Sequence, residues 1–361
     1  MNGMRGVAAI AVVMWHAPLY FGLRFGSSYL AVDLFFALSG FVLAHAYEAR
    51  FERGMGVASF MRLRFIRLFP LFSLGIAITL TGVVIGLAAG MRTSWTPASL
   101  AWCAGFNILF LPAPSVPSAT LFPLNVPGWS LFLELFANLL YVLTWRLLSN
   151  RVLMAIMGSA AVALVFCATM FGDLGGGWAW RTLVVGVARV LYGFPAGVLI
   201  YRLARNWRPL RINALFAIAA MVLIFAIDPK SARIAYDLAA VLVVLPAIVI
   251  VASLTRPTRF IGFFSFLGTT SYAVYAIHHP IITLGNSAVT EQLGKTLKQF
   301  TPWSGLVLMA AMLCAAWLLD RWYDEPARRW MLAFCAHPAN LVKRASHAES
   351  IPAQQAKRIA I

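Results

Sequence analysis

The sequence predicts an all-α fold, a polytopic integral membrane protein built as a bundle of about ten transmembrane helices. Of its 361 residues, 61% are hydrophobic and 11% are charged, whereas soluble domains carry about 25% charged residues. The mean hydropathy is +0.81. The apolar residues gather into segments of membrane-spanning length, and no polar stretch is long enough to form a separate soluble domain.

A helix needs about 20 apolar residues to cross a bilayer. Ten segments come close to this length, and we predict one span in each of residues 5–22, 29–47, 69–90, 129–147, 152–171, 183–203, 211–227, 235–254, 268–286 and 303–323. These spans belong to one transmembrane domain, residues 1–335. The remaining residues, 336–361, are polar and rich in small side chains, which predicts a disordered cytoplasmic tail.

Two connections between spans are long. In residues 48–68, aromatic and aliphatic side chains alternate with arginines, which predicts a short amphipathic helix lying on the membrane surface. Residues 91–128 are rich in proline and serine and include an apolar stretch at 99–111. This stretch is too short for a span, so we expect an interfacial or re-entrant element there.

The lysines and arginines gather in one set of loops, which predicts the orientation of the chain in the membrane. The net charge is +17. The basic residues separate apolar segments instead of lining a soluble face, so we expect the lipid bilayer and not a nucleic acid as the partner. The set expected in the cytoplasm, together with both termini, holds Arg5, Arg50, Arg53, Arg62, Arg64, Arg67, Arg146, Arg151, Arg202, Arg205, Arg208, Arg211, Arg256, Arg259 and the residues from Arg321 onward.

An arginine and a histidine share one face of the first span. His16 follows Arg5 by eleven positions. A helix turns about 100° per residue, so His16 returns to nearly the same face, roughly 16 Å further along the axis. We expect this imidazole near the bilayer midplane, where ionisable groups usually mark a reaction or transport path. The structural alternative is a half-buried arginine at the helix end and a satisfied core histidine.

A second candidate site is a cluster of arginines on the cytoplasmic side. Arg64 and Arg67 lie one helical turn apart, with Arg62 close to them. Guanidinium groups bind phosphate through paired hydrogen bonds, so the cluster predicts a site for a phosphorylated ligand. Positive-inside topology with contacts to lipid head groups would explain the same charges.

The fourth span begins on the outer side with several polar residues. Trp129 suits the aromatic belt at a membrane interface, and Ser130 is suited to cap the start of the helix. Glu134 lies about 7 Å deeper, inside the apolar zone. Because a carboxylate there is costly to keep without a partner, we expect a functional role for Glu134.

Other spans also carry polar residues. In the ninth span, Ser271, Tyr275 and His278 share a helical face. Pro280 is expected to kink that helix beside the histidines, either as a packing device or to open a cavity. Asp33 in the second span and Arg189 in the sixth both lie in the outer half of the membrane. We expect them to form an ion pair, with a structural and a functional role equally open.

Taken together, these segments resemble the acyltransferase-3 family of integral membrane acyltransferases, over about residues 2–330. Five motifs carry the resemblance and follow the family's order. They are an Arg-x10-His opening from Arg5 to His16; Val32-Asp33-Leu34-Phe35-Phe36 with Leu38-Ser39-Gly40-Phe41; an Arg-x-x-Arg at Arg64 and Arg67; a Trp-Ser-Leu segment at Trp129 and Ser130 with Glu134; and a Ser-Tyr…Tyr…His element from Ser271 to His278.

The resemblance implies transfer of an acyl group, often acetyl, from cytoplasmic acyl-CoA to a hydroxyl of a carbohydrate or related acceptor. Such acceptors include exported glycans, cell-envelope glycoconjugates, antibiotics and small glycosides. Acyl-CoA is then a co-substrate, and we expect neither a permanently bound cofactor nor a metal site. The resemblance also implies a multi-pass protein of the bacterial inner membrane.

The expected catalytic residues are His16, Glu134 and Arg5. His16 would take the proton from the acceptor hydroxyl as that hydroxyl attacks the thioester carbonyl. Glu134 would either orient His16 and stabilise its imidazolium or bind the hydroxyls of the acceptor. Arg5 would bind a donor phosphate or steady the developing charge. Direct transfer and a transient acyl-enzyme both remain open.

The remaining candidate residues bind the donor or support the site. Arg64 and Arg67, with help from Arg62, are expected to hold the phosphates of acyl-CoA. The residues expected to bind the acceptor or to support the site are Trp129, Ser130, Asp33, Ser39, Tyr275, His278 and Arg189.

Two other classes of function are compatible with a polytopic membrane protein. A proton-coupled transporter or flippase would use His16, Glu134 and His278 as a relay, but it gives no reason for the spacing of the cytoplasmic arginines. A non-catalytic scaffold leaves the buried histidine and glutamate unexplained. The sequence contains no G-x-S-x-G, H-E-x-x-H, G-x-G-x-x-G or Walker-type motif, so serine-hydrolase, zinc-protease and nucleotide-fold functions have no support.

Overall fold

A computed structural model describes residues 1–90, 94–114, 116, 118–208, 213–255, 260–293 and 297–335. These residues form helices and, within the described ranges, no strand; one isolated bridge joins Thr120 and Ala179. Six helical segments of the described chain are long and apolar enough to cross a membrane, and further apolar helices stand among them. The predicted polytopic helical membrane fold is confirmed. The predicted tail, 336–361, lies outside the described residues.

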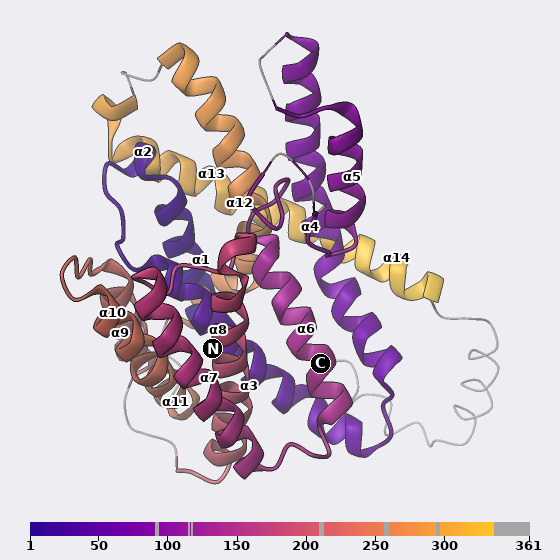
Figure 1. Ribbon diagram of the computed structural model, residues 1–361, viewed down its shortest axis with the longest axis vertical. Coiled ribbons are helices and arrows are strands. Elements are labelled where there is room, and N and C mark those ends of the chain that lie inside the picture. The colour runs from indigo at the N-terminus through magenta and orange to yellow at the C-terminus, as the bar shows by residue number, and fades with distance from the viewer. Residues whose placement is uncertain are drawn as a thin grey trace.

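The helices follow the apolar segments of the sequence, and each of the ten predicted spans overlaps one or more of them (Figure 1). In chain order they are α1 (Asn2–His16), α2 (Pro18–Phe21), η1 (Ser28–Leu30), α3 (Ala31–Glu52), α4 (Val57–Ala88), α5 (Pro97–Ile108), α6 (Gly128–Thr144), α7 (Asn150–Phe171), η2 (Trp180–Thr182), α8 (Leu183–Ala204), α9 (Ala214–Ala226), α10 (Arg233–Ala239), η3 (Ala240–Val244), α11 (Leu245–Leu254), α12 (Ile261–Leu293), η4 (Leu297–Phe300), α13 (Trp303–Leu319), η5 (Asp320–Asp324) and α14 (Glu325–Cys335).

The connections between helices gather at two ends of the bundle. The chain passes from α3 to α4 and from α6 to α7 at the lower end in Figure 1, and α8 ends there. We call this the arginine-rich end, because these connections and the adjoining helix ends carry Arg50, Arg53, Arg146, Arg151, Arg202 and Arg205. The segment that contains α2 and the connection from α7 to α8 lie at the opposite end.

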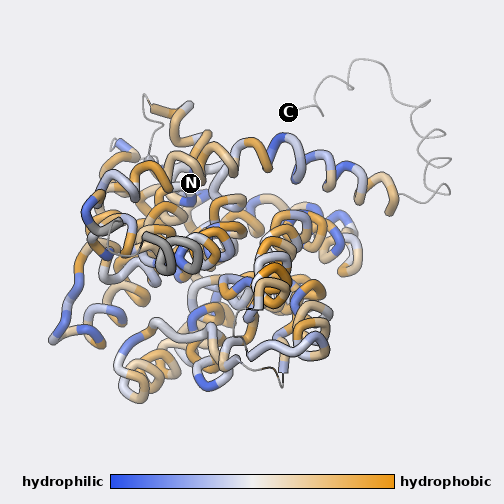
Figure 2. Tube along the Cα trace, turned by 90° about the horizontal axis from the view of Figure 1, so that it is seen from above, coloured by the Kyte–Doolittle hydropathy of each residue, from blue (hydrophilic) through white to orange (hydrophobic). Residues whose placement is uncertain are grey.

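The helices present apolar side chains outward as well as inward. Hydrophobic residues predominate along the helices on all sides of the bundle (Figure 2). Large apolar side chains such as Val162 and Phe216 are 71% and 69% exposed. In a soluble protein such a surface would aggregate, whereas lipid solvates it.

The first predicted span is interrupted in the structure. α1 ends at His16, Ala17 leaves the helical region with φ −118° and ψ 44°, and Pro18 begins the short helix α2. A residue that precedes proline is sterically driven out of the α conformation, and proline donates no backbone hydrogen bond to continue the helix. His16 is therefore the last residue of its helix, and the prediction of one continuous helix over 5–22 is wrong.

Of the predictions for the two long connections, one is wrong and the other agrees with the structure in part. The prediction of a separate amphipathic helix within 48–68 is wrong, because α3 runs to Glu52 and α4 is one helix of 32 residues from Val57. No helix-breaking residue stands between 57 and 69, so the surface segment continues directly into the span. The apolar stretch 99–111 does form a short helix, α5, which lies beside α4 (Figure 1) and begins with a capping box between Thr96 and Ser99.

Close helix crossings at glycines position the residues of the candidate site. A Cβ atom on Gly197 of α8 would lie 1.9 Å from the carbonyl oxygen of Ala37, and one on Gly40 of α3 would lie 2.0 Å from that of Phe194. Small residues allow such close packing of membrane helices. At a second crossing, a Cβ on Gly6 of α1 would lie 2.4 Å from Leu267 of α12. These crossings place α3 against α8 and α1 against α12.

Candidate active site

Two cavities meet inside the bundle, and Tyr275 and Val32 line both of them. The first, which we call the arginine cavity, has a volume of about 110 Å³. Its polar lining includes Arg5, Arg64, Arg67, Glu134, Ser271 and Tyr272. The second, which we call the histidine cavity, has a volume of about 470 Å³. Its lining includes His16, His279, Arg24, Trp15, Trp129 and Trp178.

Arg64 is fixed in the arginine cavity by a carboxylate from another helix. Its Nη2 donates to Oε1 of Glu134 at 2.7 Å, and the two side chains are 14% and 15% exposed. Ser39 of α3 donates its hydroxyl to the same Oε1 at 2.7 Å. In the amide orientation that satisfies both of its neighbours, Asn138 accepts from Arg64 Nε at 3.1 Å. Glu134 and its neighbours therefore hold one face of this guanidinium towards the cavity.

Arg67 lies beside Arg64 within about the first three turns of α4. Its Nη1 donates to Oδ2 of Asp324 at 3.3 Å, and its guanidinium lies 5.4 Å from the centre of the Tyr272 ring. Arg328 shares the same carboxylate, with Nη2 at 3.0 Å from Oδ2. Because Arg67 and Arg328 both pair with the single buried carboxylate of Asp324, the charge of Arg67 is only partly neutralised.

Arg5 contributes a third guanidinium to the arginine cavity. Within the described part of the chain its side chain makes no hydrogen bond and no ion pair, although Glu134 attracts it electrostatically. The charged side chains that line this cavity are thus Arg5, Arg64 and Arg67 against Glu134 alone. This excess of positive charge favours an anionic ligand.

Arg62, the third predicted donor-binding arginine, points elsewhere. Its side chain is exposed, and Nη1 donates to the carbonyl oxygen of Cys335 at 3.5 Å. It lines neither of the two cavities. The structure therefore brings Arg64 and Arg67 to the site together with Arg5, and leaves Arg62 at the surface beside the end of α14.

His16 lies in the histidine cavity with its protonation pattern set by its own helix. Nδ1 is 2.9 Å from the carbonyl oxygen of Val12. A carbonyl only accepts, so Nδ1 carries the hydrogen, and Nε2 of the neutral ring keeps its lone pair. An imidazole held in this way can accept a proton through Nε2 without help from a carboxylate.

Two further histidines surround His16. The ring centres of His278 and His279 lie 5.0 and 5.8 Å from that of His16. Nδ1 of His278 donates to the carbonyl oxygen of Tyr275 at 2.8 Å, and its buried Nε2 has no hydrogen-bond partner in the described structure. An unpaired buried acceptor is costly, which is a common feature of functional sites.

The predicted ion pair between Asp33 and Arg189 is confirmed. Arg189 Nη2 lies 2.7 Å from Asp33 Oδ2 and Nε lies 3.0 Å from Oδ1, with the side chains only 1% and 3% exposed. Two further guanidinium hydrogens are donated to the carbonyl oxygens of Gly176 and Tyr29, each at 2.9 Å. This buried pair ties α3 and α8 to the segments that form one wall of the histidine cavity.

The predicted positions of Trp129 and Ser130 need correction. Trp129 is 6% exposed and packs against the guanidinium of Arg189 at 5.4 Å, so it does not belong to an aromatic belt. Ser130 does not cap α6, because that helix begins at Gly128. The Ser130 hydroxyl instead donates to the carbonyl oxygen of Pro127 at 3.0 Å, and it lies 2.6 Å from the hydroxyl of Tyr275. With its own hydrogen donated elsewhere, Ser130 accepts from Tyr275.

The face predicted for the ninth span is present on α12 and follows the two cavities. Ser271 lines the arginine cavity, Tyr275 lines both cavities, and His278 packs against His16. The helix continues through Pro280. The ring of Phe35 packs edge-on against Tyr275 with 5.4 Å between ring centres, so aromatic side chains form the junction between the cavities.

Glu134 does not contact His16. Its carboxylate lines the arginine cavity and pairs with Arg64, whereas His16 lines the histidine cavity and bonds to Val12. The prediction that Glu134 orients the imidazole is therefore wrong. The reason is that a half-buried arginine on α4 offers the carboxylate a stronger partner than a neutral imidazole does.

Some residues of the site were missed by the sequence analysis. His279 adjoins the predicted His278, and Tyr272 adjoins Ser271, so the motif itself carried a signal for both. Trp15 adjoins the predicted His16 in the same way, whereas Arg24 and Trp178 have no such signal. Arg24 comes from the connection after α2 and Trp178 from the segment between α7 and α8, and only the fold brings them into one cavity.

Comparison with known proteins identifies relatives along nearly the whole chain. Residues 1–321 match a family model described as an acyltransferase domain. The chain is 38% identical over 181 residues to protein 2 in the picA locus of Rhizobium radiobacter, which covers 47% of this chain and 94% of that protein. It is 26% identical over 366 residues to the acyltransferase MdmB of Streptomyces mycarofaciens, which covers 91% of each chain.

A longer relative is the peptidoglycan O-acetyltransferase OatA of Listeria monocytogenes, 24% identical over 372 aligned positions. The alignment covers 91% of this chain and 55% of that protein, so the chain spans about half of the length of OatA. No solved structure matches the chain. Since the family model covers most of the sequence and named acyltransferases are related to it along nearly all of its length, the chain belongs to the acyltransferase-3 family and transfers acyl groups other than aminoacyl groups.

Proposed function

We propose that this protein transfers an acyl group, acetyl in the simplest case, from acyl-CoA to a hydroxyl of a carbohydrate or glycoconjugate acceptor. The observation that carries the proposal is the junction of two chemically different cavities at Tyr275. One cavity has an excess of arginines and suits an anionic donor. The other presents the lone pair of an imidazole among aromatic side chains and suits an alcohol. The relatives named as a peptidoglycan O-acetyltransferase and as an exopolysaccharide production protein support a carbohydrate acceptor.

The donor enters through the arginine cavity. Arg64, Arg67 and Arg5 are available to bind the phosphates of acyl-CoA. Glu134 holds the guanidinium of Arg64 in place, and Asp324 holds that of Arg67. The volume of about 110 Å³ is well below the 300–1,000 Å³ typical of sites that enclose a whole small molecule. The acyl-pantetheine arm therefore enters while the nucleotide stays at the mouth. The positive-inside rule favours placing this end, and both termini, in the cytoplasm, where acyl-CoA is available.

The acceptor enters through the histidine cavity from the opposite end. Nε2 of His16 takes the proton of the acceptor hydroxyl as its oxygen attacks the thioester carbonyl. The new carbon–oxygen bond forms, the carbon–sulfur bond breaks, and the thiolate of CoA receives the proton from the imidazolium. Arg5, which has no ion-pair partner among the described residues, lines the arginine cavity and not the histidine cavity, so its role is to bind the anionic donor.

The proton-coupled transporter, the main alternative, is disfavoured by the family and by the separation of its relay groups. Glu134 lines the arginine cavity and pairs with Arg64, so it does not continue a chain of histidines. Chemistry and transport also differ in their needs, because transport requires a sealed compartment.

Purified protein in detergent micelles tests the proposal. Acetyl-CoA supplied with simple glycosides should release free CoA thiol and yield an acetylated sugar, and His16→Ala should abolish both. The matched control is His45→Ala, since His45 packs against Tyr201 outside the two cavities. Activity retained in His16→Ala would remove His16 from the mechanism; thiol release without an acetylated sugar would make the protein a thioesterase.

A further inference from the structure

The histidine cavity has an unusual chemical lining that narrows the class of acceptor. Three tryptophans, Trp15, Trp129 and Trp178, and the ring of Tyr29 line it, and aromatic faces pack well against the C–H face of a sugar ring. None of its lining residues is a carboxylate. Its volume of about 470 Å³ lies within the 300–1,000 Å³ typical of small-molecule sites. The cavity therefore has room for a sugar ring together with a charged substituent.

Arg24 supplies an uncompensated charge to this cavity. Its guanidinium lies 3.4 Å from the centre of the Trp15 ring, so the side chain is held over one wall. In the described structure Arg24 makes no hydrogen bond and no ion pair. Asp228, the carboxylate that attracts it electrostatically, is already paired with Arg233. Arg24 thus keeps its donors free at the mouth of the cavity.

The other cation of the cavity is neutralised. Arg189 is paired with Asp33 through two hydrogen bonds and donates two more to backbone carbonyls, so its charge is balanced within the protein. The histidines are neutral acceptors in the arrangement described above. The net charge offered to a ligand is therefore the single positive charge of Arg24.

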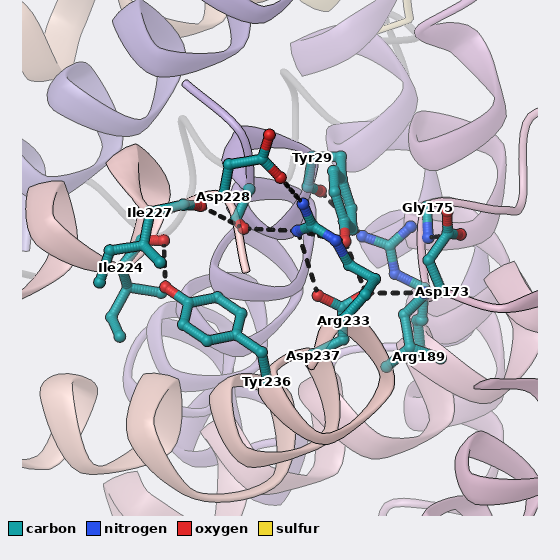
Figure 3. Close-up of polar contacts among 12 residues, drawn as sticks. Tyr29, Asp173, Gly175, Arg189, Ile224, Ile227, Asp228, Arg233, Tyr236 and Asp237 are labelled. Carbon is teal, nitrogen blue, oxygen red and sulfur yellow. Dashed lines mark hydrogen bonds and ion pairs between the residues drawn. The ribbon is translucent and has the colours of Figure 1, made fainter. Parts of the chain in front are cut away.

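Tyr29, whose ring packs edge-on against Trp15 with 5.2 Å between ring centres, belongs to a polar network beside this cavity (Figure 3). The hydroxyl of Tyr29 donates to Asp237 Oδ2 at 2.5 Å, and the backbone nitrogen of Leu174 donates to the same oxygen at 2.9 Å. Arg233 Nη1 donates to the hydroxyls of Ser27 and Tyr29 at 2.7 and 3.2 Å. Neither Asp237 nor Asp228, the carboxylates that pair with Arg233 in this network, lines the histidine cavity.

From these contacts we propose that the acceptor carries an anionic group, a carboxylate or a phosphate, which binds Arg24 while the sugar ring packs against the tryptophans and a hydroxyl reaches His16. The proposal rests on the proposed function in one respect, namely that the histidine cavity is the acceptor site. A free cation over an aromatic wall, in a cavity without carboxylates, discriminates against neutral sugars by leaving its charge unpaired when they bind.

Binding of three probes to the purified protein tests this inference separately from catalysis. The probes are methyl β-D-glucuronoside, glucose 1-phosphate and methyl β-D-glucoside, titrated by calorimetry in detergent. We expect at least one anionic probe to bind about tenfold or more tightly than the neutral glucoside, the effect of one charge-assisted contact. Binding of the glucuronoside alone would identify a carboxylate as the recognised group, and binding of the phosphate alone a phosphate. The advantage should shrink as salt is raised.

Variants connect the preference to one side chain. Arg24→Gln should lower the affinity for the anionic probes to the affinity for the glucoside. Arg181→Gln is the matched control, because Arg181 is an exposed arginine of the same end that does not line the cavity, and it should bind as the wild type does. His16→Ala should keep the anion preference while losing acyl transfer.

The outcomes separate the two proposals. If the neutral glucoside binds as tightly as both anions, or if Arg24→Gln keeps the preference, the inference is wrong, even where acyl transfer to sugars is observed. If the anion preference depends on Arg24 but acetyl-CoA is never consumed, the anion site stands and the proposed function fails.

Discussion

Tyr275 donates a hydrogen bond to Ser130 at 2.6 Å at the point where the arginine cavity meets the histidine cavity. One residue comes from α12 and the other from α6, so the contact closes the junction between two helices that lie far apart in the sequence. In the proposed mechanism the thioester passes this contact to reach His16. In the same mechanism the contact would also keep water from the donor when no acceptor is bound.

Opening this junction should uncouple thioester cleavage from transfer. Tyr275→Ala removes the ring that both cavities share, so water should reach the thioester, and acetyl-CoA hydrolysis without acceptor should rise relative to transfer. Tyr275→Phe keeps the ring and loses only the hydrogen bond, so its effect should be smaller. The ratio of CoA released with and without a glycoside measures this. An unchanged ratio in Tyr275→Ala would contradict a gating role.

The pairing of Glu134 with Arg64 predicts an effect on donor binding. Glu134→Gln keeps the shape of the side chain but removes the charge that holds the guanidinium, so KM for acyl-CoA should rise several-fold, with a smaller change in kcat. Glu48→Gln is the control, because Glu48 forms a similar half-buried pair with Arg202 at 2.6 Å outside both cavities. A fall in kcat at constant KM would instead return Glu134 to a direct role in the chemistry.

The three arginines in the first turns of α4, Arg62, Arg64 and Arg67, should differ in importance. Arg64→Gln and Arg67→Gln should each raise KM for acyl-CoA about tenfold or more, since each removes a charged contact to phosphate. Arg62→Gln should have a clearly weaker effect, because that side chain is exposed and bonds to Cys335. Equal effects of all three substitutions on donor KM would indicate a diffuse electrostatic contribution and not a built phosphate site.

Part of this site could be predicted from the sequence because local rules determine it. Arg5 and His16 lie on one helix, and Ser271, Tyr275 and His278 share one face, as helical periodicity requires. The pairing of Asp33 with Arg189 also followed, since two opposite charges at similar depth in lipid have few other partners. The ten apolar segments predicted the helices for the same reason, because backbone groups in lipid must be satisfied within the segment.

The rest depended on three-dimensional packing. Glu134 and Arg64 are 70 positions apart, and only the packing of α4 against α6 makes them partners. The end of α1 at His16 followed from Pro18, whose effect outweighed the apolar character of the segment. Arg24 and Trp178 line the histidine cavity from segments that connect helices. The path of such segments cannot be predicted from helical periodicity.

The buried pair of Asp33 and Arg189 predicts a marked loss of stability when one partner is removed. Asp33→Asn or Arg189→Met should lower the free energy of unfolding by about 3–5 kcal/mol, because a buried charge is left uncompensated. The control is Glu325→Gln, which breaks an exposed pair with Arg329 and should cost at most about 1 kcal/mol. Thermal unfolding in detergent measures the difference. Equal melting temperatures in the three variants would contradict the burial of the pair.

The crossing of α3 and α8 should be intolerant of even one added methyl group. Gly197→Ala would place its Cβ 1.9 Å from the carbonyl oxygen of Ala37, so the helices must separate and the melting temperature should fall. Gly158→Ala is the matched control in α7, where nothing lies within 4 Å of the added atom. Because alanine favours helices over glycine, this control should be neutral or slightly stabilising. A stable Gly197→Ala protein would show that the crossing is looser than described.

The most direct test of the central claim follows a labelled acetyl group. Purified protein is incubated with acetyl-CoA labelled in the acetyl group and with a glycoside acceptor, and the sugar is analysed by mass spectrometry. The wild-type protein should yield labelled, O-acetylated sugar, and His16→Ala should yield none while retaining its fold and its binding of acyl-CoA. Labelled sugar formed by His16→Ala at the wild-type rate would contradict the account, because the proton of the acceptor would then be taken by another group.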